Sequence, residues 1–189
     1  MLTLFATYLI AISIGAGAAF INDLFFIISL KHHVLKRHEI VILKQLNNIQ
    51  VFLIVWVILC EIVFFSFQIQ NFSLDSFLGV TVAKLLIEIT VLFCALLIRQ
   101  MHLPALIRHQ HTYGHLSDSF VEHSNSLVGT CITSMVSWGF IILITSAAFD
   151  RTASNFGFSA TILTYIAVCL VASWFFMLLK NKVLHRRGK

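Results

Sequence analysis

Five long apolar runs divide this chain. They cover residues 2–30, 47–68, 77–100, 125–149 and 159–180, and each reaches the length of about 20 residues that a membrane-spanning helix needs. The wall of a membrane barrel would alternate apolar and polar residues, whereas residues 51–58 are apolar on every face. The pattern predicts an all-α fold, a polytopic membrane bundle of five transmembrane helices. It forms a single domain over residues 1–189, with a short basic tail at 181–189.

The composition narrows the functional class. Hydrophobic residues make up 59% of the chain and charged residues 11%, against about 45–50% and about 25% in soluble domains. These values exclude a soluble enzyme, a disordered chain and a nucleic-acid binder, despite the net charge of +5. The sequence contains no phosphate-binding glycine loop, nucleophile elbow or His-Glu-x-x-His motif. A catalytic role therefore has no motif to support it.

Lysine and arginine residues indicate the orientation, because cytoplasmic loops carry the excess of basic charge. Eleven of them lie in the first and third connections and after the last span, against one in the second and fourth connections. This bias predicts an outside N-terminus and a cytoplasmic C-terminus in a bacterial cytoplasmic (inner) membrane. The basic tail has the composition that attracts anionic lipids, and it also serves as a positive-inside anchor.

Four charged residues lie within the predicted spans: Asp23, Glu61, Lys84 and Glu88. Each costs about 2.5–3.5 kcal/mol at the centre of a membrane helix, so each needs a partner, a water cavity or a function. Lys84 and Glu88 are one helical turn apart, and Glu61 lies at a similar depth in the preceding span. We expect these three residues to form one triad.

The triad has two interpretations. In the first, it is a structural ion pair that holds spans two and three together, while Asp23 sits in the interfacial region near Lys31 or the first loop. In the second, Glu88 is a proton or cation site, because an intramembrane carboxyl group without a full counter-charge can exchange a proton near neutral pH.

Small and hydroxyl residues recur at helical spacing in two spans. In the fourth span these residues lie on one helix face, which is typical either of a close-packing seam or of a permeation path. In the first span a similar face should pack tightly against a neighbouring helix. The two sets are Ser126, Thr130, Ser134 and Ser137, and Ala11, Gly15, Ala19 and Asn22. Trp138 lies near mid-membrane, where its indole N–H needs an acceptor, and Glu88 is at the matching depth.

Cysteines and histidines are the remaining candidates for metal chemistry. One cysteine falls in each of spans two to five without paired spacing, which is typical of small buried hydrophobic residues. All nine histidines lie outside the apolar cores, on the predicted cytoplasmic side. His109, His111 and His115 have the density of a transition-metal tract, and His33 with His102 is a candidate pair of axial ligands for haem b. The alternative is that these histidines are titratable residues near anionic headgroups.

Short segments between residues 17 and 138 carry a family resemblance. They are Gly17-Ala18 followed by Asp23, Phe25, Phe26 and Leu30-Lys31; Ile42-Leu43-Lys44; Ala83-Lys84; Leu103-Pro104-Ala105-Leu106; and Ser134-Met135-Val136-Ser137-Trp138. In these segments the chain resembles an uncharacterised family of small bacterial polytopic membrane proteins with four to five helices. Where such proteins have Asn-Gly in the third span, this chain has Cys94-Ala95. The resemblance implies the architecture alone, and it draws attention to Asp23, Lys84 and Trp138.

Two functional hypotheses follow. The first is a small proton or cation channel, transporter or accessory subunit that uses the intramembrane polar residues, as a homo-oligomer or a subunit of a membrane complex in the lipid bilayer. This first hypothesis needs no cofactor. The alternative is a protein of electron transfer or sensing that binds haem or a transition metal through the cytoplasmic histidines.

Overall fold

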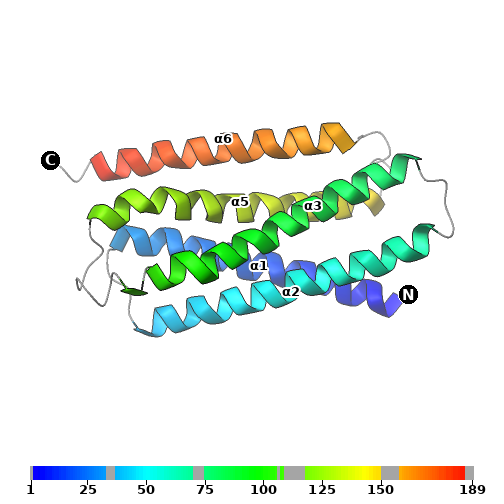
Figure 1. Ribbon diagram of the computed structural model, residues 1–189, viewed down its shortest axis with the longest axis horizontal. Coiled ribbons are helices and arrows are strands. Elements are labelled where there is room, and N and C mark those ends of the chain that lie inside the picture. Colours follow the sequence, from blue (N-terminus) through cyan, green and yellow to red (C-terminus); the bar gives the residue numbers. More distant parts are fainter. Residues whose placement is uncertain are drawn as a thin grey trace.

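The computed structural model describes residues 2–32, 37–69, 75–105, 107–108, 118–149 and 158–185. Within these ranges every regular element is a helix, so the predicted all-α class is confirmed for the described part of the chain. The elements are α1 (Leu2–His32), α2 (Arg37–Ile69), α3 (Asp75–Leu97), the π-helix η1 (Ile98–His102), α5 (Asp118–Phe149) and α6 (Phe158–His185) (Figure 1).

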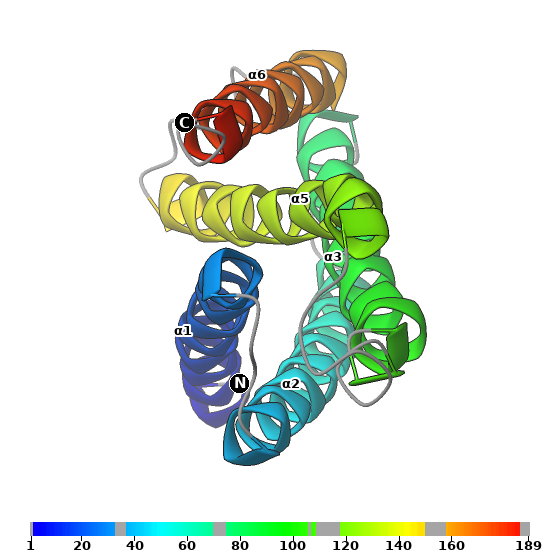
Figure 2. The same ribbon diagram turned by 90° about the vertical axis from the view of Figure 1, so that its left-hand side faces the viewer.

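Four long helices form most of the core, and the last one adds Tyr165 to it from one side. Viewed from the end, α1, α2, α3 and α5 face one another, whereas α6 lies against α5 and α3 (Figure 2). Consecutive helices run in opposite directions, so residues near the start of α1 lie level with residues near the end of α2 (Figure 1). Polar residues that are distant in sequence can therefore meet at one level of the bundle.

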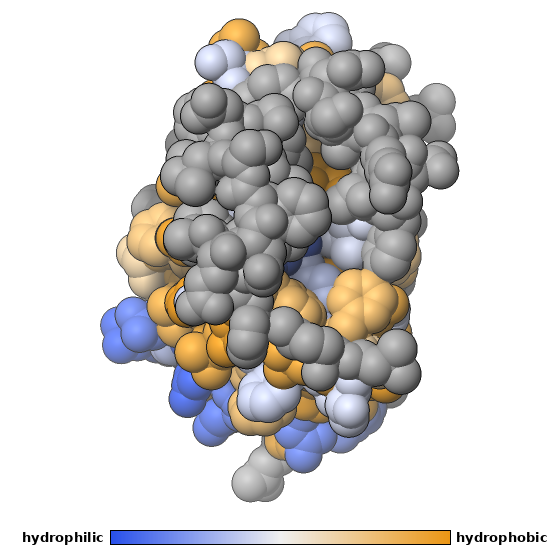
Figure 3. Space-filling view, turned by 90° about the vertical axis from the view of Figure 1, so that its right-hand side faces the viewer, coloured by the Kyte–Doolittle hydropathy of each residue, from blue (hydrophilic) through white to orange (hydrophobic). Residues whose placement is uncertain are grey.

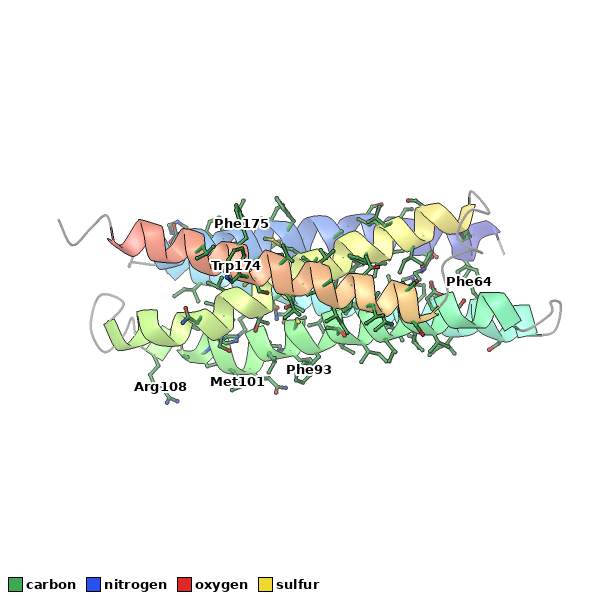
Figure 4. All side chains as sticks on the ribbon, turned by 90° about the horizontal axis from the view of Figure 1, so that it is seen from above. Phe64, Phe93, Met101, Arg108, Trp174 and Phe175 are labelled. Atoms are coloured by element: carbon green, nitrogen blue, oxygen red, sulfur yellow. The ribbon has the colours of Figure 1, made fainter. Side chains whose placement is uncertain are left out.

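Among the described residues, four helices are long and apolar enough to cross a membrane, which indicates a membrane protein. The apolar stretches are Thr3–Phe25, His38–Phe64, Thr81–Ala105 and Asn125–Ser146, and α6 contributes a shorter one, Ser159–Phe175. Large apolar side chains lie on the outside; for example, Phe93, Met101 and Phe175 point away from the bundle (Figure 4). The buried positions include small residues and polar ones. This distribution suits a bundle in lipid, where the surroundings are as apolar as a protein core.

Two helices begin earlier than their apolar runs. Helix α2 begins at Arg37 and α5 at Asp118, whereas the apolar pattern places the starts at 47 and 125. In α2 the added turns bury Leu43 completely and leave Lys44 exposed. These turns include the apolar residues 40–43, and the apolar stretch of the helix accordingly begins at His38.

The π-helix η1 directly precedes the one proline of the chain, Pro104. The N–H of Leu103 donates to the carbonyl of Ile98, five residues earlier. Proline has no N–H, and its ring crowds the carbonyl four residues before it, which is that of Gln100. The wider turn accommodates this crowding and sets the position of His102 at its end. Such π turns are frequent at functional sites.

The core has two parts. The larger contains Tyr8, Ile12, Ile54, Val57, Ile87, Val91, Trp138 and Ile141, and the smaller contains Leu43, Ile98, Leu103, Leu127 and Cys131. All four cysteines are free thiols, and three of them are buried.

Candidate functional site

Three polar side chains from three helices meet in what we call the Lys84 cluster: Tyr8, Glu61 and Lys84. The Lys84 ammonium donates to Glu61 Oε1 and to the hydroxyl of Tyr8, and that hydroxyl donates to the same carboxylate oxygen. The side chains of Lys84 and Glu61 are only 10% and 12% exposed. The predicted pairing of Glu61 with Lys84 is therefore present.

Aromatic packing holds the phenol of Tyr8 in this position. Its ring lies edge-on to Phe64, with the centroids 5.6 Å apart, and against Phe5 at 6.4 Å. The Lys84 ammonium also lies 4.8 Å from the centroid of the Tyr8 ring, a distance suited to a cation–π contact. Tyr8 thus connects α1 to the ion pair between α2 and α3. Tyr8 is not among the residues that the sequence pattern predicts for this site.

The Lys84 cluster lies towards the end of the bundle that holds the N-terminus. Figure 3 looks onto that end, where the surface is hollowed between the helix ends and pale to blue, more hydrophilic residues are visible in the hollow.

Glu88 does not join Lys84, contrary to the predicted triad. It is fully buried, and neither carboxylate oxygen has a hydrogen-bond partner among the described residues. Helical side chains lean toward the N-terminus of their helix, so Lys84 extends away from Glu88 and toward Glu61. A lysine placed four residues before a glutamate is also the weaker order for a helical ion pair. The spacing brings the two residues onto one face without directing them to each other.

Trp138 also lies where the sequence predicts, but without the expected partner. Its indole is 2% exposed, and its Nε1 has no hydrogen-bond partner in the part of the chain that the structure describes. The predicted bond to Glu88 is therefore absent. The ring lies instead against Gly15 of α1, where an added β-carbon would be only 2.5 Å from its Cη2 atom. Because Gly15 has no side chain, the large indole ring fits against α1 at this position.

A second group of polar residues, the Asp23 cluster, lies between Trp138 and the other end of the bundle. It consists of Asn22, Asp23, Asn47, Gln50 and Ser134, and all five are buried. Gln50 Nε2 donates to Ser134 Oγ at 3.2 Å. Asp23 lies beside Ser134 and Cys131 of α5 without reaching hydrogen-bond geometry. The Asp23 carboxylate is buried in the protein interior, beside α5, and its expected place in the interfacial region of the membrane stays a prediction.

Ser137 connects the bundle to α6. Its hydroxyl donates to the carbonyl of Thr133 at 2.6 Å and lies 2.8 Å from the hydroxyl of Tyr165. Ser134 and Ser137 thus face different partners, α2 and α6. The seam in α1 is buried as predicted, at Ala11, Ala19 and Asn22.

The buried polar groups are too costly for a dry interior. Ten side-chain nitrogen and oxygen atoms are buried without a partner in the described ranges. They belong to Asn22, Asp23, Asn47, Gln50, Glu88 and Trp138. A buried polar atom that lacks a partner costs about 1–3 kcal/mol. These atoms therefore need partners beyond the described protein atoms.

Asn47 and Gln50 of this set are not among the residues that the sequence pattern predicts for the site. They lie at the start of the second apolar run, where polar residues resemble the end of a loop. Their separation of three residues puts them on one helix face, and that spacing was the available signal.

Most of the nominated histidines lie outside the described residues, namely His33, His109, His111 and His115. His102 is described; it is half-buried, and its Nε2 lies 3.5 Å from Thr130 Oγ1. Within the described ranges, no group of three or more histidine, cysteine or acidic side chains could hold a metal ion. The metal or haem site stays a prediction.

Comparisons with protein-family models, with curated proteins and with solved structures find no match in any of the three. The resemblance to small bacterial polytopic proteins thus also stays a prediction. Functional inference rests on the geometry of the bundle.

Proposed function

We propose that this protein moves protons or monovalent cations through the polar interior of its helix bundle, as a channel, a transporter or an accessory subunit of such a system. One observation carries the proposal: a set of buried polar atoms without partners in the described helices, which belong to Glu88, to Trp138 and to the Asp23 cluster. Intramembrane polar residues that face the bundle interior commonly mark ion or proton pathways.

Glu88 and Asp23 are the carboxylates of this set, since Glu61 is paired with Lys84. A carboxylate can bind a proton or a cation in turn, so these two side chains are the proposed relay. Trp138 lies between their levels, pressed against Gly15. In this proposal the indole closes the route between the two carboxylates, and its displacement opens it.

We propose five spans, with α6 as the fifth. Its 28 residues extend about 42 Å as a helix, longer than the hydrocarbon core of about 30 Å. Its exposed residues include Leu163, Leu170, Val171 and Trp174, which suit contact with lipid or with another subunit. A homo-oligomer or a larger membrane complex belongs to the proposal, as do anionic lipids at the basic tail.

We propose the orientation with the N-terminus outside and the C-terminus in the cytoplasm of a bacterial cell, on the distribution of basic residues. A membrane-impermeant thiol reagent added to intact cells should label single cysteines introduced at Ser73 and Ser154, and should not label those at His38 and His111. Labelling at His111 from outside would invert the orientation.

The transport proposal is tested by flux into liposomes that contain the purified protein. Proton and monovalent-cation flux should exceed that of empty liposomes between about pH 5 and 8. Glu88→Gln should abolish this flux, because it removes the carboxylate while keeping the size of the side chain. The control is Glu39→Gln in the first turn of α2, which should conduct as the wild type does.

Folding of each variant is checked by its size-exclusion profile. If the wild type shows no flux with either polarity, the isolated protein does not transport ions. The accessory-subunit role then becomes the leading proposal. Unchanged flux in Glu88→Gln would remove Glu88 from the path.

A further inference from the structure

The Asp23 cluster joins three helices at one level of the bundle. Asn22 and Asp23 come from α1, Asn47 and Gln50 from α2, and Ser134 from α5. The exposed fraction is 0% for Asn22, Asp23, Gln50 and Ser134 and 1% for Asn47. Their polar ends therefore lie inside the protein and away from lipid.

The register of α1 against α2 places the two asparagines opposite each other. Tyr8 of α1 contacts Glu61 of α2. Asn22 is fourteen residues further along α1, and Asn47 is fourteen residues earlier in α2. Because antiparallel helices rise equally per residue, Asn22 and Asn47 lie at the same level. Gln50, one turn away from Asn47, is fixed to α5 by its bond to Ser134.

Oxygen atoms outnumber nitrogen atoms among the side-chain polar groups of the cluster. Both carboxylate oxygens of Asp23 and the side-chain carbonyls of Asn22, Asn47 and Gln50 have no hydrogen-bond partner within the described helices. The amide nitrogen of Gln50 is already engaged by Ser134, which leaves its carbonyl oxygen available. Asparagine amides can turn so that oxygen faces a ligand and nitrogen faces away. The cluster thus offers up to five acceptor oxygens, with the Ser134 hydroxyl as a sixth.

The charge of the cluster favours a singly charged ligand. Asp23 is its one ionisable side chain. The ammonium of Lys84 is engaged by Tyr8 and Glu61, and Tyr8 lies about 22 Å from Asp23 along α1, at about 1.5 Å per residue. A monovalent cation would neutralise the carboxylate, whereas a divalent one would leave a buried positive charge. Hard cations prefer oxygen ligands of this kind, carboxylate and amide carbonyl.

We propose that the Asp23 cluster binds a dehydrated monovalent alkali-metal cation, for which Asp23 supplies the charge and Asn22, Asn47, Gln50 and Ser134 supply neutral oxygens. The inference rests on the proposed function in that it names the class of ion that passes through the bundle. Binding itself requires no transport, so the two are tested separately.

The test is equilibrium binding of radioactive Na⁺ to the purified full-length protein in detergent. The wild type should bind Na⁺ saturably. Li⁺ or K⁺ should displace it, whereas choline, which is too large, and Ca²⁺, which carries a second charge, should not. Asp23→Asn should weaken binding by about tenfold or more, because a charged ligand becomes a neutral one.

A matched pair in α2 keeps the test informative if Asp23→Asn does not fold. Asn47 is buried in the cluster, whereas its neighbour Asn48 is exposed. Asn47→Ala should weaken Na⁺ binding, and Asn48→Ala should leave it unchanged. Absence of saturable Na⁺ binding in the folded wild type, equal affinity in the two asparagine variants, or displacement by Ca²⁺ would overturn the proposal.

Flux measured on the same preparation separates this inference from the proposed function. Proton flux that depends on Asp23, without Na⁺ binding, would overturn the cation site and leave the proposed function standing. Saturable Na⁺ binding that depends on Asp23, without any flux, would support the site and remove transport by the isolated protein.

Discussion

The contact between Gly15 and Trp138 makes a sharp prediction about the packing of α1 against α5. In Gly15→Ala the new β-carbon would lie 2.5 Å from Cη2 and 3.0 Å from Cζ2 of the indole, closer than carbon atoms approach without displacement. Trp138 is almost completely buried, so its ring has little room to move. Overpacking of this kind costs about 1–3 kcal/mol.

Gly17→Ala is the matched control. A β-carbon at position 17 meets no atom within 4 Å, and both glycines lie in α1. Replacing glycine by alanine in a helix contributes about 1 kcal/mol of favourable propensity at either position. This contribution cancels in the comparison, so Gly15→Ala should be less stable than Gly17→Ala by about 1–3 kcal/mol.

The measurement is unfolding in mixed micelles by titration with sodium dodecyl sulfate, followed by far-ultraviolet circular dichroism. The change Trp138→Phe removes the outer ring carbons, so Gly15→Ala should cost less in that background, with a coupling of at least about 0.5 kcal/mol. Equal stability of the two alanine variants, or a coupling of zero, would refute the close approach of α1 to the indole.

Two further predictions concern the ion pair and the attachment of α6. Lys84→Met should destabilise the protein by about 3–5 kcal/mol if Glu61 remains charged. Adding Glu61→Gln should recover part of that loss. Additive losses in the same detergent titration would argue against the ion pair. Ser137→Ala should cost about 1–2 kcal/mol, because Tyr165 loses its partner. The exposed Ser146, which bonds only to its own helix in the described contacts, should tolerate the same change with little effect.

The fold class could be predicted because the bilayer imposes a simple rule. Every backbone polar group in hydrocarbon must be satisfied within the protein, so long apolar runs become helices. The buried seam of α1 could also be predicted, since Ala11, Gly15 and Ala19 are small and recur at helical spacing. The pairing of Glu61 with Lys84 followed from their similar depth in antiparallel neighbours.

Side-chain direction and the identity of facing residues could not be predicted. Lys84 and Glu88 share a face, but the lean of helical side chains toward the N-terminus directs Lys84 elsewhere. Tyr8 lies near the start of its helix, where a tyrosine resembles a residue of the interfacial belt. The convergence of Asp23 with Gln50 and Ser134 depends on how three helices pack, and a sequence pattern describes only one helix at a time.

Entry of water and cations into the bundle is tested most directly by silver accessibility of single cysteines. Silver ion is a small monovalent cation, and cysteine thiolates bind metals. Gln50 lies in the Asp23 cluster, whereas the adjacent Ile49 faces outward. Each is changed to cysteine in protein whose four native cysteines are replaced by serine, and the reaction is followed in liposomes.

If the interior is polar because water and cations enter it, Gln50→Cys should react readily with silver ion and Ile49→Cys, which faces lipid, should not. Ser134→Cys, a conservative change in α5, should react as Gln50→Cys does. Failure of both interior cysteines to react in folded protein, or faster reaction at position 49, would show that the buried polar residues only hold the helices together.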